Sequence, residues 1–167
     1  SKIFHHSKDI PSEIEELINS IDYPNFFNSP KDHLRLVLNE LLLNSFFHQE
    51  ELEDRDRRAS IFELTDSIEA KIGIDEDKVL ISVSDKIGSI NKSEVVKNII
   101  RGFNEKAPRK DSPGAGLGLY LVYQNINQLI INKKESQMSE FICIIEANKR
   151  YKKFKERVTS FHFFEEE

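Results

Sequence analysis

The apolar residues of this chain recur with two different periods, one typical of helices and the other typical of strands. Helical spacing is found over residues 14–21 and again, almost without interruption, over 31–49, so both segments are predicted to be helices. Between 68 and 83, apolar residues occupy alternate positions on both sides of an acidic turn at 75–77. Alternation on both sides of such a turn predicts a β-hairpin.

The remaining segments complete a regular order of elements. Shorter apolar patterns predict strands at 3–6, 129–131, 140–146 and 158–164 and helices at 91–103 and 116–127. The order is then one strand, two helices, two strands, two helices and three strands. Strands joined by short turns favour antiparallel pairing, and grouped helices favour one covered face of the sheet. We therefore predict a two-layer α+β sandwich with a mixed, mostly antiparallel sheet.

Length and composition narrow this picture. The 167 residues fit one domain over 1–167, with its core at about 3–147 and a basic connection and last strand within 149–167. The net charge of −5 does not favour a nucleic-acid partner. No apolar run reaches about 18 residues, so no membrane span is expected, and a cytoplasmic location is the default expectation. Cys143, inside an apolar run, is interpreted as a core residue.

The long helix carries three polar residues on an otherwise apolar segment. Glu40, Asn44 and His48 are spaced by four, so they form one stripe along the helix. An ionised carboxylate in apolar surroundings is costly unless a cation, water or ligand pairs with it. The stripe could instead face solvent, and the same three residue types could bind zinc, although no further histidine or cysteine cluster completes such a site.

Glycine is scarce but concentrated at the start of the last predicted helix. Three of the six glycines lie within 114–118, where a polar loop leads into an apolar helix. Glycines allow backbone N–H groups to approach an anion closely, which predicts a phosphate site. A flexible hinge or close helix packing is the alternative. The segment lacks the Gly-Lys-Ser/Thr of a P-loop, and no strand directly precedes it as a dinucleotide fingerprint requires.

Together these segments resemble a known family. The run from Glu40 to His48 resembles the asparagine box of the gyrase, Hsp90, histidine kinase and MutL ATPases, which share the Bergerat fold. Residues 114–119, Gly-Ala-Gly-Leu-Gly-Leu, resemble the second glycine box of that family, and 85–90 follow a predicted strand as the first glycine box does. The resemblance covers about residues 3–147, with the motifs in the family's order.

The resemblance implies ATP and Mg²⁺ as cofactors and assigns a role to each motif. Asn44 would bind the magnesium that bridges the phosphates, and Glu40 would be the general base. Asp85 would accept a hydrogen bond from the adenine amino group, and 104–113 would form a lid. The implied nucleotide-binding set is Asn44, His48, Asp85, Gly88, Gly114, Ala115, Gly116, Leu117, Gly118 and Leu119.

One motif departs from the family pattern. The first glycine box normally reads Asp-x-Gly-x-Gly, whereas this chain has Asp85-Lys86-Ile87-Gly88-Ser89. Isoleucine and serine replace both glycines, and the remaining glycine is shifted by one position. The loop on the adenine side is therefore expected to have a different shape, which bears on ATP affinity.

The short chain and the Glu-x-x-x-Asn-x-x-x-His form are most similar to stand-alone anti-sigma-factor serine kinases. That similarity implies a protein partner, either a sigma factor or an antagonist that is phosphorylated on serine or threonine. A homodimer is a separate expectation. Two alternatives stay open: a non-catalytic protein-binding module with a degenerate nucleotide site, and the catalytic fragment of a sensor histidine kinase. The basic run 149–155 could bind an acidic partner or a membrane surface, or be a solvated connection.

Overall fold

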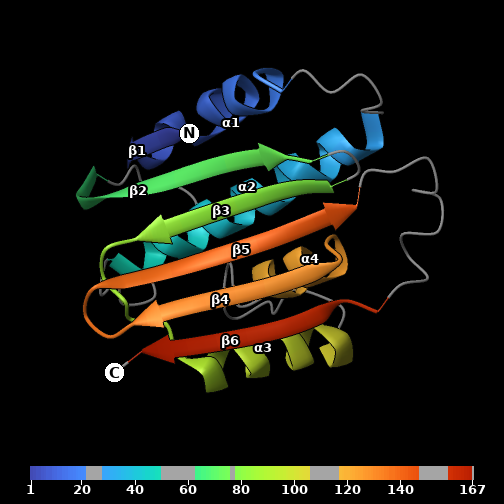
Figure 1. The fold of residues 1–167 in the computed structure, drawn as a ribbon. Coiled ribbons are helices and arrows are strands. Elements are labelled where there is room, and N and C mark those ends of the chain that lie inside the picture. The colour runs from blue at the N-terminus through green and yellow to red at the C-terminus, as the bar shows by residue number, and fades with distance from the viewer. Residues whose placement is uncertain (22–27, 50–62, 76–77, 106–116, 147–157, 167) are drawn as a thin grey trace.

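The structure is a computed structural model that describes residues 1–21, 28–49, 63–75, 78–105, 117–146 and 158–166 (Figure 1). The strands are β1 Lys2–His6, β2 Glu63–Ile74, β3 Lys78–Asp85, β4 Gln128–Lys134, β5 Met138–Glu146 and β6 Ser160–Glu166. The helices are α1 Ile10–Asn19, α2 Asn28–Gln49, α3 Lys92–Glu105 and α4 Gly118–Gln124, with a 3-10 turn at Ser7–Asp9.

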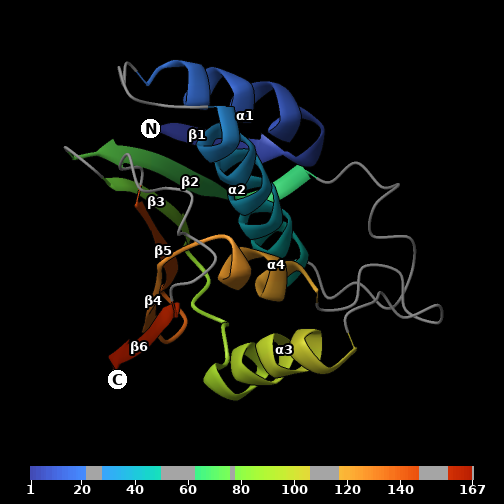
Figure 2. The same ribbon diagram turned by 90° about the vertical axis from the view of Figure 1, so that its right-hand side faces the viewer.

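The described strands form one six-stranded sheet with the order β1-β2-β3-β5-β4-β6. Each neighbouring pair is antiparallel except β4 and β6, which run parallel. Seen from the side, the four α-helices lie on one side of this sheet (Figure 2). The prediction of a two-layer α+β sandwich with a mixed, mostly antiparallel sheet is confirmed, and so is the order of its elements.

Several element boundaries differ from their predicted positions. Helix α2 begins three residues early, at Asn28, and α3 continues through Asn104 and Glu105, which had been assigned to the loop. Helix α4 ends at Gln124, three residues before its predicted end at 127. It ends there because the amide of Asn127 donates to the Ile144 carbonyl of β5 (2.8 Å) and so cannot continue the helical ladder. The predicted loop at 50–60 lies outside the described residues.

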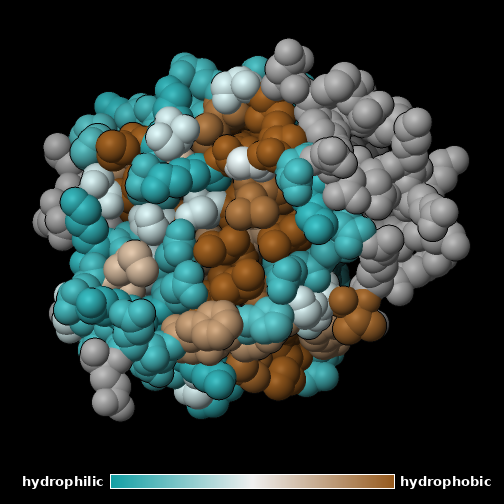
Figure 3. Space-filling model, viewed as in Figure 1, coloured by the Kyte–Doolittle hydropathy of each residue, from teal (hydrophilic) through white to brown (hydrophobic). Residues whose placement is uncertain are grey.

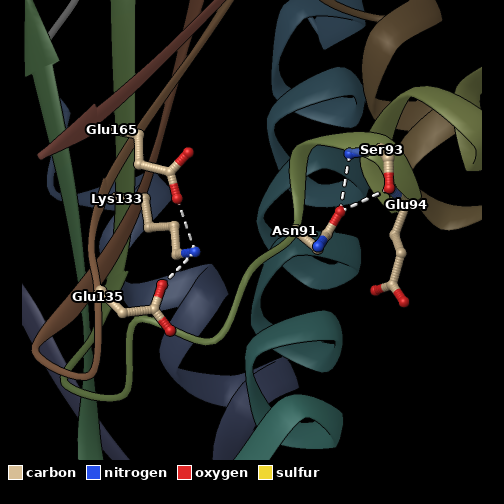
Figure 4. A network of polar contacts seen from close by, with 6 residues as sticks. All are labelled: Asn91, Ser93, Glu94, Lys133, Glu135 and Glu165. Carbon is tan, nitrogen blue, oxygen red and sulfur yellow. Dashed lines mark hydrogen bonds and ion pairs between the residues drawn. The ribbon is translucent and has the colours of Figure 1, made fainter. Parts of the chain in front are cut away.

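The core lies between the helices and the inner face of the sheet. The buried residues of helix α2 recur at helical spacing, so one face of the helix lies in the core, and its other described side chains are half-buried or exposed. Alternate residues of β3 and β5 face it, as the period-two patterns predicted. Asn91 immediately precedes helix α3, and its Oδ1 accepts hydrogen bonds from the amides of Ser93 (2.9 Å) and Glu94 (3.4 Å) (Figure 4), a typical N-cap arrangement. Fully buried core residues include Leu34, Leu38, Leu41, Leu42, Phe46, Ile81 and Leu129.

Cys143 is completely buried in β5, as its sequence context predicted. Burial disfavours the thiolate and raises the pKa of this thiol well above its usual value. Because the thiolate is the reactive form, we expect an alkylating reagent at pH 8 to leave Cys143 unmodified in the folded protein and to label it fully in denaturant. Mass spectrometry before and after unfolding measures this, and rapid labelling of the native protein would contradict the burial.

The opposite face of the sheet carries an apolar band. Leu80 of β3 pairs with Ile144 of β5, and Ile142 of β5 pairs with Ile130 of β4; all four point away from the helices. Leu80 is 40% exposed. The space-filling view shows the band running across the face, flanked by polar side chains (Figure 3). No described helix covers this face (Figure 2).

Candidate functional site

Helix α2 presents Glu40 and Asn44 to the first residue of α4. An added Cβ at Gly118 would lie 2.6 Å from Oε2 of Glu40, 3.5 Å from Nδ2 of Asn44 and 3.6 Å from its Oδ1. An added Cβ would therefore crowd the Glu40 carboxylate, whereas it would make only ordinary contact with Asn44. The polar stripe of the long helix and the last glycine of the glycine cluster, 74 positions after Asn44, therefore meet at one place. Leu117 and Leu119 flank Gly118, and Leu119 is buried.

The Asn44 amide has an unsatisfied donor. Its Nδ2 is buried and has no hydrogen-bond partner among the described residues, which costs free energy unless something else supplies an acceptor. The Oδ1 of the same amide is an oxygen ligand of the kind that magnesium prefers. An amide with one unsatisfied donor and one oxygen beside a carboxylate fits a metal-bound phosphate better than it fits an apolar core.

Asp85 is the last residue of β3 and is 6% exposed. Its Oδ1 accepts hydrogen bonds from the backbone amides of Ile87 (2.9 Å) and Gly88 (3.3 Å). These bonds hold the carboxylate in one orientation and offset part of the cost of burying it. The strand end therefore delivers an oriented carboxylate to the helix side of the sheet, the face that also carries the core.

Gly88 holds the loop after Asp85 against the turn between β4 and β5. Its φ is 66°, a backbone conformation in which glycine is strongly favoured. An added Cβ would lie 2.2 Å from the Lys134 carbonyl oxygen and 2.9 Å from the amide nitrogens of Gln137 and Met138. The glycine at this position is thus required by the backbone conformation and by the close approach of the turn between β4 and β5. The expectation that this loop differs in shape from that of the family stays a prediction.

Ser139 is a polar residue of this region that the sequence did not single out. It pairs with Asp85 across β3 and β5, so both side chains lie on the same face of the sheet. Ser139 is 1% exposed, and its Oγ has no hydrogen-bond partner among the described residues. Only the register between the two strands reveals this position, because a serine at the start of a strand carries no signal of its own.

The described structure brings together Glu40, Asn44 and Gly118, and it places Asp85 and Gly88 at the end of β3. The side chain of His48 lies outside the described residues, although its backbone belongs to α2. Gly114, Ala115, Gly116 and most of the predicted lid also lie outside them. Among the described side chains, no group of three or more His, Cys, Asp or Glu could hold a metal ion. None of the described helices combines the length and apolarity needed to span a bilayer.

Known proteins show the same combination of motifs and fold. The family described as histidine kinase-, DNA gyrase B- and HSP90-like ATPases matches residues 29–154, well over half of the chain and all of the site above. The chain belongs to this ATPase family. The resemblance inferred from the asparagine and glycine boxes is therefore confirmed, and the matched segment begins at the second residue of α2 and ends before β6.

A solved structure supports the fold. A chain in the crystal structure of the SiaB–SiaC complex from Pseudomonas aeruginosa is similar to this one with a TM-score of 0.54 and 16% sequence identity. The similarity covers 86% of this chain and 88% of that chain. At this identity the comparison speaks for a shared fold. No curated protein sequence matches the chain.

Proposed function

We propose that this protein binds ATP with magnesium and transfers the γ-phosphate to a serine or threonine hydroxyl of a partner protein. The contact of Gly118 with both Glu40 and Asn44 carries the proposal, because it unites the two motifs that phosphate transfer requires. Membership of an ATPase family makes the adenine nucleotide the natural ligand. The Glu40, Asn44 and His48 spacing favours an anti-sigma type of regulator, whose partner would be a sigma factor or its antagonist. The predicted homodimer and cytoplasmic location belong to the same hypothesis.

Each residue has a distinct task in this proposal. Asp85 uses Oδ1 for the backbone amides, so Oδ2 is the oxygen that would accept the adenine amino hydrogen. Asn44 would bind magnesium through Oδ1 and donate through Nδ2 to a phosphate oxygen. Residues 114–119 would line the triphosphate with backbone N–H groups, and His48 would complete the nucleotide set. ATP supplies the phosphoryl group, and magnesium neutralises charge that develops on the phosphates.

Glu40 would act on the hydroxyl that receives the phosphate. It is half-buried beside the start of α4, where its carboxylate can accept the proton as the hydroxyl oxygen attacks. Phosphoryl transfer depends mainly on positioning and charge neutralisation, so a carboxylate held against Gly118 is suited to the role. A group that only positions nucleotide would not need to be a base.

Calorimetric titration with ATP, with and without magnesium, tests the nucleotide site. We expect magnesium to strengthen ATP binding in the wild-type protein and to have no effect in Asn44→Ala, because the mutant lacks the oxygen ligand. Asn132→Ala is a matched control, since Asn132 lies on the opposite face of the sheet and bonds to Glu140 (2.9 Å); it should bind as the wild type does.

The same titration separates the alternative functions. No binding at millimolar ATP would overturn the proposal and favour a protein-binding module in which the turn after Asp85 has disabled the site. If ATP binds, Glu40→Ala should retain binding and lose phosphate transfer. Equal transfer by Glu40→Ala and wild type would remove Glu40 from the role of base.

A further inference from the structure

The C-terminal strand β6 lies beyond the part of the chain that matches the ATPase family, which ends at residue 154. It nevertheless extends the sheet, pairing in parallel with β4 from Ser160 opposite Gln128 to Glu166 opposite Lys134. The far end of β6 is fixed by an ion pair between Glu165 and Lys133 (2.8 Å), and Lys133 also pairs with Glu135 (Figure 4). Strand β6 is therefore anchored to β4 by its backbone pairing and by an ion pair near its end.

The start of β6 is joined to the end of α4 by reciprocal hydrogen bonds. The Tyr123 hydroxyl donates to the Thr159 carbonyl (2.6 Å), and the Thr159 hydroxyl lies 3.0 Å from the Tyr123 carbonyl and 2.9 Å from that of Ile126. The Ser160 amide donates to the Asn127 carbonyl (3.1 Å). The segment that begins β6 is thus bonded to three backbone carbonyls at the end of α4 and in its connection to β4, those of Tyr123, Ile126 and Asn127.

Tyr123 also contacts helix α3. The Phe103 ring meets the Tyr123 ring edge to face with centroids 6.1 Å apart, and it meets Tyr120 in the same way at 5.0 Å. Gly102 lies directly on Tyr120, because an added Cβ there would come within 2.2 Å of its ring. Helices α3 and α4 are the elements on either side of residues 106–117, which contain the first two glycines of the cluster. Tyr123 therefore links β6 to both helices that flank that segment.

We propose that Tyr123 is a positioning residue that couples the docking of β6 to the phosphate side of the nucleotide site. Helix α4 spans only Gly118 to Gln124, so a shift at its Tyr123 end is transmitted within two turns to the Gly118 end, which touches Glu40 and Asn44. Docked β6 holds α4 in that place, and loss of the Tyr123–Thr159 bonds releases it. Asp85 sits on β3, outside this connection. This inference rests on the proposed function.

Coupling between two sites is reciprocal, which gives the inference two independent readouts. Tyr123→Phe removes the hydroxyl and keeps the ring against Phe103, and Thr159→Val removes the hydroxyl at nearly constant volume. Each should lower ATP affinity about three- to tenfold, the effect of one net hydrogen bond. AMP, which depends mainly on the Asp85 side, should bind with unchanged affinity. ATP should also slow hydrogen exchange of the β6 amides in the wild type and not in Tyr123→Phe.

Two controls isolate the bonds from general effects on the helix. Tyr120→Phe removes a hydroxyl that has no hydrogen bond to a described residue of β6, and Thr159→Ser keeps the bonding hydroxyl; both should behave as wild type. Equal losses of ATP and AMP affinity would show a merely structural role and overturn the inference. Unchanged ATP affinity with unchanged exchange in β6 would also overturn it while leaving the proposed function intact. Absence of ATP binding by the wild type would overturn both.

Discussion

Gly118→Ala is expected to slow phosphate transfer about 100-fold while leaving the protein folded. The added methyl group would lie 2.6 Å from Oε2 of Glu40, so the carboxylate must move by about 1 Å or more. Misplacement of a reacting group by that distance can reduce rates by about two orders of magnitude. The atom that must move is the end of a flexible side chain, and alanine is the better helix former, so stability should not fall.

The measurement uses water as the accepting hydroxyl and follows phosphate release from MgATP together with the melting temperature. Gly73→Ala is a matched control, because its added methyl meets only the Leu80 Cβ at 3.7 Å, an ordinary contact. It should have wild-type rates. A Gly118→Ala protein with an unchanged rate would show that the Glu40 carboxylate works from another position or not at all. A large drop in melting temperature would show instead that Gly118 is needed for packing.

The residues of this site could be predicted in part from the sequence. Order and spacing placed Glu40, Asn44 and Gly118 in one site through a family resemblance, and the structure brings them into contact. Helical periodicity alone located α2, since a strongly apolar segment with a regular polar stripe has few other interpretations. The role of Glu40 and Asn44 depends on the start of α4, which lies against them. Periodicity cannot predict that these two helices are neighbours.

The features that the sequence missed all depend on partners distant in the chain. Ser139 matters because the register of β5 places it beside Asp85. The end of α4 is set by a bond from Asn127 to β5, where local propensity alone favoured a longer helix. The parallel pairing of β6 with β4 and the Tyr123–Thr159 bonds could not be predicted, because strands at the end of a chain can join either edge of a sheet.

The effect of the changed first glycine box on Asp85 could not be predicted from the sequence alone. By sequence, the replacement of two glycines by Ile87 and Ser89 suggested a differently shaped loop on the adenine side. The structure shows that the amides of Ile87 and Gly88 bond to Asp85, so the loop still orients that carboxylate. Gly88 supports the turn from a shifted position. The carboxylate of Asp85 is therefore held by backbone hydrogen bonds although the glycine spacing of the family motif is lost.

Gly88→Ala is accordingly expected to lower the free energy of unfolding by about 3 kcal/mol or more. A φ of 66° costs an L-residue with a Cβ about 1–2 kcal/mol, and overlap with packed atoms adds about 1–3 kcal/mol. The overlap here is severe, because the added Cβ would lie 2.2 Å from the Lys134 carbonyl oxygen, a backbone atom that cannot rotate away. Denaturant titration of Gly88→Ala beside Gly73→Ala measures the loss.

A third variant separates the two causes. Asparagine tolerates the left-handed region better than alanine does but brings the same Cβ toward the turn between β4 and β5. If Gly88→Asn is as unstable as Gly88→Ala, the contact with Lys134 dominates; if it is markedly more stable, the backbone conformation does. Stability within about 0.5 kcal/mol of wild type in both variants would mean that the turn can move aside, and Gly88 would then have no part in holding the carboxylate of Asp85.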